Sequence, residues 1–141
     1  APEEIYKKPA NRFVADFIGT TNFIAGEIAE VLKDRDLVYI HTEFGQKMHC
    51  RVFDSVMATP NKKVHASIRP EDIEVFTEPQ KDKDNLFKGT IMHRAYLGNF
   101  LYLFVNVDNT MIRVQAPYDI TQKEGEELFL YLNPEKCIIL P

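Results

Sequence analysis

The segment from residue 100 to 108 constrains the fold most, because it carries apolar side chains on both faces of one strand. One set of alternating positions is aliphatic: Leu101, Leu103, Val105 and Val107. The other set is aromatic, before it gives way to Asn106 and Asp108: Phe100, Tyr102 and Phe104. Successive side chains of a strand point to opposite faces. A strand that is apolar on both faces near Phe104 is typical of a central or barrel strand.

Other short strands are predicted at close spacing along the chain. Their ranges are 37–44, 47–53, 64–68, 110–116, 127–132 and 137–140. Gly45-Gln46 is predicted to turn the first of these strands into the second, and Asp108-Asn109 to turn the aromatic strand back. Many short strands with one early helix predict a mainly all-β fold, an OB-like small barrel or sandwich.

The early helix is predicted at about 9–18. Its apolar residues fall on one helical face, and they are Phe13, Val14, Phe17 and Ile18. Pro9 suits a first turn and Gly19 suits a C-cap. We expect residues 1–22 to be a connecting segment and residues 23–141 to be one domain. We expect Ala1, which stands in place of an initiator Met, to mark a cut inside a longer protein, although removal of Met or trimming of a tag gives the same first residue.

The polar stretch PQKDKDN at 79–85 is predicted to be a loop. Each side of it carries several strand signals. The domain is therefore compatible with two coupled sub-sheets joined near 79–85, although no clean internal repeat is visible in the sequence.

Charge and cysteine content narrow the classes of function. The net charge is −4, whereas a nucleic-acid binder usually shows a basic footprint. Two cysteines in 141 residues make no disulfide framework, which favours a reducing compartment. The apolar runs are far shorter than the roughly 20 residues of a membrane span.

The sequence offers no catalytic, cofactor-binding or metal-ligating set. The patterns GxxxxGK[ST], GxGxxG and GxSxG are all absent. A two-residue turn at Gly45-Gln46 would place His41 across from Cys50, but two ligands are fewer than a metal site needs. Glu71-Asp72 beside Arg69-Pro70 is better explained as a turn than as an acid pair.

Several segments together resemble the ATP-binding subunits of ABC importers for maltose, polyamines, iron and sulfate. The opening EIY, RFVADFIG and NFIAGEI resembles the stretch that leaves the nucleotide-binding domain of those subunits. The segment SIRPEDI, with Arg69, Pro70, Glu71 and Asp72, resembles the signature of their regulatory domain. Tyr96-Leu97-Gly98 before an aromatic strand and Pro134-Glu135 near the end resemble its later parts.

This resemblance implies a C-terminal regulatory domain of the transport-associated OB (TOBE) type. It implies no catalysis in this piece, with ATP and Mg belonging to a preceding domain, and a cytoplasmic location peripheral to the inner membrane. The implied partners are a second copy in a weak homodimer, the parent's nucleotide-binding domain and the membrane subunits, with no nucleic acid. Arg69, Pro70, Glu71, Asp72 and Gly98 are expected to be structural, and no ligand-binding residue is identified.

Two alternatives from other classes stay open on the sequence. One is a free-standing oxyanion-binding protein of the molybdate-binding kind, which uses a related fold. The other is an OB-fold nucleic-acid binder in which the aromatic stripe stacks bases. An enzyme is the least supported of the readings.

Overall fold

The computed structural model describes residues 20–32, 36–53 and 58–140, and the predicted helix at 9–18 lies outside them. The strands are β1 (Asn22–Leu32), β2 (Leu37–Thr42), β3 (Lys47–Arg51), β4 (Lys63–Ile68), β5 (Ile73–Phe76), β6 (Leu86–Leu97), β7 (Phe100–Val107), β8 (Thr110–Ala116), β9 (Glu127–Leu132) and β10 (Ile138–Leu140). Within these described ranges, the short 3-10 helices are η2 (Pro70–Asp72) and η3 (Pro134–Lys136).

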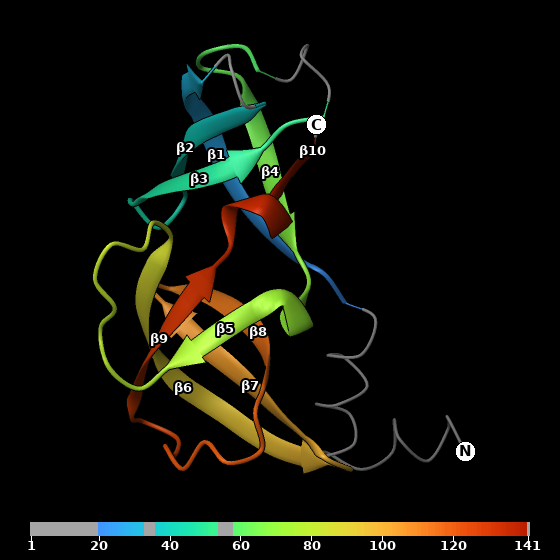
Figure 1. Cartoon of the computed structure of the whole chain (residues 1–141), viewed down its shortest axis with the longest axis vertical. Coiled ribbons are helices and arrows are strands. Elements are labelled where there is room, and N and C mark those ends of the chain that lie inside the picture. Colours follow the sequence, from blue (N-terminus) through green and yellow to red (C-terminus); the bar gives the residue numbers. More distant parts are fainter. Residues whose placement is uncertain (1–19, 33–35, 54–57, 141) are drawn as a thin grey trace.

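The strands form two units that are stacked along the long axis of the molecule (Figure 1). Barrel A is closed, in the order β1-β2-β3-β10-β4, and β4 pairs back onto β1. Sheet B has the order β5-β9-β6-β7-β8, and its edge strands β5 and β8 approach each other. The predicted all-β, OB-like barrel architecture is confirmed.

The inner face of β7 forms the centre of sheet B. Leu101, Leu103 and Val105 have no exposed surface. On the outer, aromatic face the exposure of the side chains varies along the strand, because Phe100 is 49% exposed whereas Tyr102 is 8% exposed. The aliphatic face is therefore core, and the aromatic face is a separate surface of the molecule.

Barrel A and sheet B repeat one topology. In this correspondence β1 to β4 match β6 to β9, and β10 matches β5. The order of barrel A then becomes β6-β7-β8-β5-β9, which is the order of sheet B when it is followed as a ring from β6 and from β8 on to β5. The fifth strand is exchanged between the halves, because β5 follows β4 in the chain but pairs with β9, and β10 follows β9 but pairs with β4. The sequence was compatible with two coupled sub-sheets but displayed no clean repeat, and the strand order shows that the two halves share a topology.

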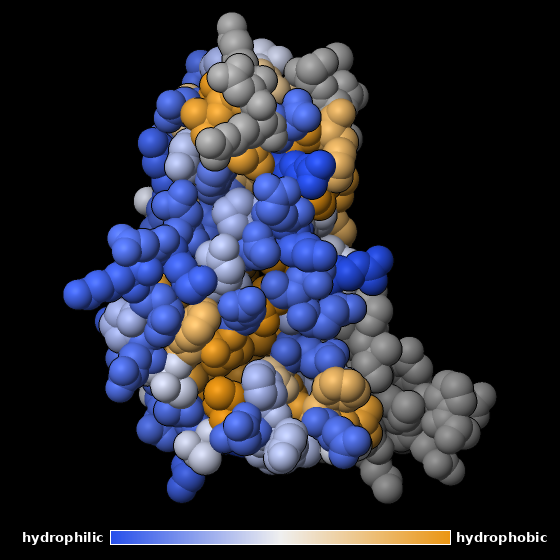
Figure 2. All heavy atoms as spheres, viewed as in Figure 1, coloured by the Kyte–Doolittle hydropathy of each residue, from blue (hydrophilic) through white to orange (hydrophobic). Residues whose placement is uncertain are grey.

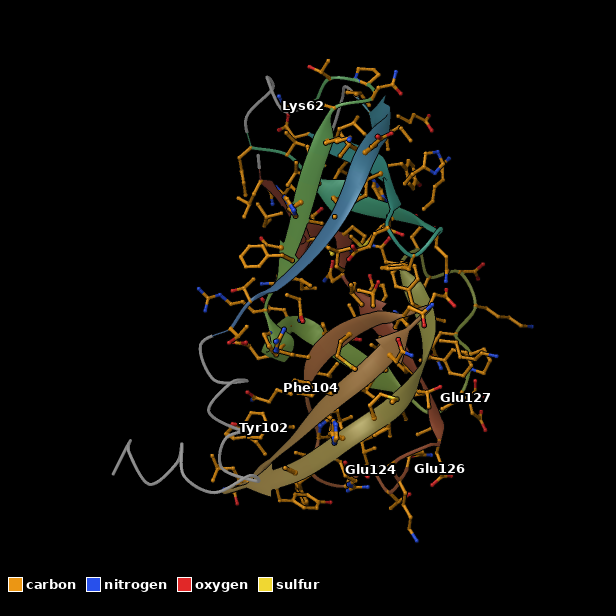
Figure 3. All side chains as sticks on the ribbon, turned by 180° about the vertical axis from the view of Figure 1, so that it is seen from behind. Lys62, Tyr102, Phe104, Glu124, Glu126 and Glu127 are labelled. Atoms are coloured by element: carbon orange, nitrogen blue, oxygen red, sulfur yellow. The ribbon has the colours of Figure 1, made fainter. Side chains whose placement is uncertain are left out.

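The local geometry repeats as well. The pairing of β1 with β2 shifts register between Ile28 and Glu30, and that of β6 with β7 shifts between Ile91 and His93. In each half a turn carbonyl accepts the N–H of the residue at the bulge, Lys62 from Ile28 and Glu126 from Ile91. Lys62 and Glu126 lie toward opposite ends of the molecule (Figure 3), as expected for halves related by a pseudo-two-fold axis.

Gly26 and Gly89 occupy the same place in the two halves, where neighbouring strands approach closely. A Cβ at Gly26 would lie 2.6 Å from the carbonyl oxygen of His41, and one at Gly89 would lie 2.5 Å from Cγ1 of Val105. Contacts this short require the neighbour to move.

Gly26→Ala is therefore expected to lower the free energy of unfolding by roughly 2 kcal/mol, because the obstructing atom belongs to backbone. Gly125→Ala is the matched control, since a Cβ there meets nothing within 4 Å and only its φ of +88° is unfavourable. Urea denaturation of both variants measures the difference. Equal losses in the two variants would contradict the role of close strand approach at Gly26.

The join between the two halves differs from the prediction. The 79–85 loop connects β5 to β6, which are both strands of sheet B. The chain crosses between the halves at η2 and again at η3. The exchange of the fifth strands explains the difference. β5 precedes the 79–85 loop in the chain, but it belongs to sheet B, whose other strands follow the loop.

The β2–β3 hairpin also differs from the prediction. Its register pairs His41 with Lys47 and Cys50 with Val38, so Gly45-Gln46 is part of a longer connection and His41 does not face Cys50. Phe44 is buried in that connection and makes an edge contact with Phe87 of β6, at 5.2 Å between ring centroids. Burying this ring between the halves accounts for the longer turn.

Candidate functional site at the junction of the two halves

A buried asparagine joins barrel A to the edge of sheet B. Asn22, at the start of β1, is 2% exposed. Its side-chain amide donates to the carbonyl oxygen of Arg113 at 2.9 Å, and its Oδ1 accepts the N–H of Arg113 at 2.8 Å. The Asn22 amide thus replaces the backbone of a neighbouring strand along part of β8, which is an edge strand.

The equivalent asparagine makes the reciprocal connection. Asn85, just before β6, has its Oδ1 2.7 Å from the N–H of His49 in β3 and its Nδ2 2.7 Å from the carbonyl oxygen of His49. The same Nδ2 donates to the carbonyl oxygen of Leu132 at 2.7 Å. Asn85 adopts φ of +61°, a conformation that asparagine tolerates better than most residues. We call Asn22 and Asn85 the asparagine clamps.

The clamps fix how the two halves are arranged. Each one satisfies buried backbone groups of the other half, and such groups are costly to leave unpaired. Relative rotation of the halves would break both sets of bonds at once. The two halves are therefore expected to move as one body.

The residues of the SIRPEDI signature lie at the crossing between the halves. Pro70 begins η2 and is buried, while Asp72 donates its backbone N–H to the carbonyl oxygen of Arg69 at 3.0 Å. These positions support the expected structural role of the signature in a turn. Gly98 is not part of this group, because it lies in the β6–β7 hairpin with φ of +60°.

A cavity of about 290 Å³ opens beside this crossing. Its polar rim combines Arg69 and Asp72 from the first crossing with Glu135 and Lys136 from the second. Glu135 accepts a charge-assisted hydrogen bond from Arg51 at 3.0 Å. The rim carries two basic and two acidic side chains, so its formal charges balance.

A second polar group lies where the 79–85 loop meets barrel A. Asp84 accepts a hydrogen bond from the Tyr39 hydroxyl at 3.3 Å and lies 3.5 Å from Nδ1 of His49. The Tyr39 and His49 rings stack at 4.5 Å. Burial, and then the charge of Asp84, raises the pKa of Tyr39. Tyr39 and His49 of barrel A and Asp84 of the loop thus pack together where the loop meets the barrel.

The two cysteines are buried free thiols on neighbouring parts of barrel A. A hydrogen bond with Cys137, more than burial, raises the pKa of Cys50, so this thiol stays protonated and weakly reactive. Across the described ranges, no group of three or more His, Cys, Asp or Glu side chains is arranged to hold a metal ion.

The sequence reading missed both clamps, although a signal for them was present. Asn22, Gly26 and Ile28 have the same spacing as Asn85, Gly89 and Ile91. The two crossings repeat too, as Arg69-Pro70-Glu71 and Asn133-Pro134-Glu135. These short matches become a repeat only when the strand order shows that they occupy equivalent places.

The exposed surface is mixed rather than uniformly apolar. On the face drawn in Figure 2, hydrophilic residues predominate and apolar side chains gather in separate patches. No helix within the described residues is long and apolar enough to cross a membrane.

The comparisons with known proteins agree with this architecture. Residues 66–140 match the family described as TOBE domain. The chain is 34% identical over 131 residues to the spermidine/putrescine import ATP-binding protein PotA of Trichormus variabilis, covering 92% of this chain and 34% of that protein. It is 30% identical to the putrescine transport ATP-binding protein PotG of Escherichia coli, covering 99% of this chain and 38% of that protein.

A solved structure shares the fold. The cytoplasmic molybdate-binding protein ModG superposes with a TM-score of 0.79 at 16% identity, covering 88% of this chain and 99% of that one. At this identity the likeness concerns the fold alone. The chain spans about a third of the length of the curated relatives PotA and PotG.

Proposed function

Because the chain belongs to the TOBE domain family, we propose that it is the regulatory and pairing module of the ATP-binding subunit of an ABC importer. The observation that carries the proposal is the match to PotA over 92% of this chain, which extends well beyond the family match at 66–140. In this reading ATP and Mg bind elsewhere in the subunit. The module itself acts through its surfaces, at the cytoplasmic side of the transporter.

The rigid junction supports a regulatory role. Because the two halves of the module move as one body, a displacement of one surface also moves the other surface, with no hinge between them to absorb it. A ligand or protein that binds one arrangement of paired subunits better than another then shifts ATPase activity by that difference in affinity.

The names of the relatives favour polyamines as the imported solute. PotA is described as a spermidine/putrescine import ATP-binding protein and PotG as a putrescine transport ATP-binding protein. The solute would pass through the membrane subunits, so no polyamine site is required in this module.

The pairing proposal predicts a weak homodimer of the isolated chain. Association costs several kcal/mol of rigid-body freedom, and here it lacks any contribution from ATP-clamped domains. We expect a dissociation constant in the micromolar range or weaker, with the same surface used on both copies. Sedimentation velocity over a concentration series measures it. A chain that stays monomeric at every concentration would contradict pairing through this module.

The ModG-like fold supports a second candidate, an oxyanion-binding protein. Calorimetric titration with molybdate separates the two candidates. Saturable binding together with a dimer that persists at nanomolar concentration would favour the oxyanion-binding protein. Absence of heat together with weak association would favour the importer module.

A further inference from the structure

Barrel A encloses two thiols side by side. Cys50 is the fourth residue of β3, and Cys137 directly precedes β10 in extended backbone, with φ of −89° and ψ of 104°. β10 lies between β3 and β4 (Figure 1), and Ile138 is the parallel partner of Arg51. Cys137 therefore lies next to Cys50, one residue before that pair on each strand. Both cysteines have no exposed surface.

The spacing of the two cysteines suits a disulfide. The backbone N–H of Arg51 donates to the carbonyl oxygen of Cys137 at 2.7 Å, so the two strands are in direct contact at this point. Neighbouring strands lie about 4.8 Å apart, and disulfides join Cα atoms that are about 4.4–6.8 Å apart. Arg51 and Ile138 are half-buried on the outer face, so the cysteines that precede them share the inner face.

The surroundings of the sulfur atoms tolerate the loss of the thiol hydrogens. A hydrogen bond with Cys137 raises the pKa of the Cys50 thiol, which means that the two thiol groups are in contact. Cys137 Sγ donates to the carbonyl oxygen of Leu132 at 3.6 Å, but that oxygen also accepts from the Asn85 clamp at 2.7 Å. Oxidation of Cys137 therefore leaves the Leu132 carbonyl with a hydrogen-bond partner.

Access to the two thiols is limited by β10. With three residues, β10 is the shortest strand in the described part of the chain, and it pairs with β3 at one position and with β4 at three. A strand held by so few contacts opens more readily than the long strands around it. An oxidant therefore reaches the thiols through local opening of β10, while the closed barrel protects them.

We propose that Cys50 and Cys137 are a redox-sensitive pair that forms an intramolecular disulfide when its surroundings become oxidising. The bond ties β3 to the second crossing between the halves, where Nδ2 of Asn85 lies 3.9 Å from Cys137 Sγ. In a reducing compartment the pair is reduced at rest, and the disulfide forms only when the thiol pool becomes oxidised. This device is independent of the proposed importer function.

The oxidant that balances the reaction is a small disulfide such as oxidised glutathione. The thiolate of one cysteine attacks a sulfur atom of the oxidant and displaces one glutathione. The thiolate of the other cysteine then attacks the protein sulfur of this mixed disulfide and displaces the second glutathione. The two protein thiols thus lose two electrons and two protons, and the oxidant is reduced to two molecules of glutathione that take up the protons.

Incubation of the full chain with oxidised glutathione, followed by blocking of free thiols, tests the proposal. We expect the mass of the chain to fall by two hydrogen atoms and peptide mapping to join the segments that carry Cys50 and Cys137. The oxidised chain should melt about 5–15 °C higher than the reduced chain, because the bond closes a long loop of the unfolded chain. Dithiothreitol should reverse both changes.

Cys50→Ala and Cys137→Ala are the matched controls. Neither should gain an intramolecular disulfide or a higher Tm with the oxidant, and their melting curves in reducing buffer verify that they fold. The parent chain unfolded in urea shows how fast accessible cysteines react. Thiols that stay reduced in the folded parent, under conditions that oxidise the unfolded chain, would overturn the proposal. So would a stable glutathione adduct, a disulfide between two chains or a disulfide that lowers the Tm.

Discussion

Asn85→Asp is expected to lower the free energy of unfolding by roughly 3–6 kcal/mol, a large part of the stability of a domain of this size. The substitution keeps the shape of the side chain and its tolerance of positive φ. It removes the donor to the carbonyl oxygens of His49 and Leu132 and places a carboxylate at a site that is 7% exposed. Chemical denaturation with matched m-values measures the loss.

Substitutions of two other asparagines provide comparisons for the loss of stability expected at Asn85. Asn22→Asp removes one donor, to the carbonyl oxygen of Arg113, and should cost less than Asn85→Asp. Asn99 is exposed between β6 and β7, so Asn99→Asp should change stability by at most about 0.5 kcal/mol. A loss at Asn85 no larger than that at Asn99 would mean that the clamp is not needed to hold the halves together.

Division of the chain in the exposed 77–80 loop is expected to give two fragments that are unfolded alone and folded together. The first fragment carries β5, which belongs to sheet B, and lacks β10, which completes barrel A. The second fragment carries β10 and lacks β5. Each fragment alone therefore leaves an apolar interior open at one strand position, and half-chains of this size bury too little surface to compensate.

Circular dichroism and NMR of each fragment and of an equimolar mixture measure the effect. Mixing should restore native dispersion and a cooperative melting transition, because both exchanged strands can return to their places. If the first fragment folds alone with a cooperative transition, the exchanged strand is dispensable and the two halves are separable domains.

The strands that the sequence predicted well are those with an unbroken pattern. The range 127–132 coincides with β9, and the aliphatic alternation of β7 is the buried face of sheet B. Asp108 and Asn109 both take positive φ in the turn from β7 to β8, as their residue types favour. Such features depend on neighbours in the chain and can be predicted from local chemistry.

The long strands β1 and β6 were not predicted, and the reason is visible in their register. Each contains a bulge, after Ile28 and after Ile91, which breaks the two-residue period by which strands are recognised. A glycine in each removes one apolar side chain from the pattern where strands approach closely. Bulges and close approaches are decided by the partner strand, which the sequence does not display.

By itself the sequence determined the fold class and the family resemblance, whereas the structural role of Arg69 to Asp72 stays a prediction. Only the tertiary structure decided that Asn22 and Asn85 join the halves, that the fifth strands are exchanged and that Cys50 faces Val38 instead of His41. The physical reason is the separation along the chain over which each kind of interaction acts. Side-chain period and turn chemistry act over a few residues, whereas Asn22 bonds to Arg113 and Asn85 to His49, contacts that exist only after distant strands have paired.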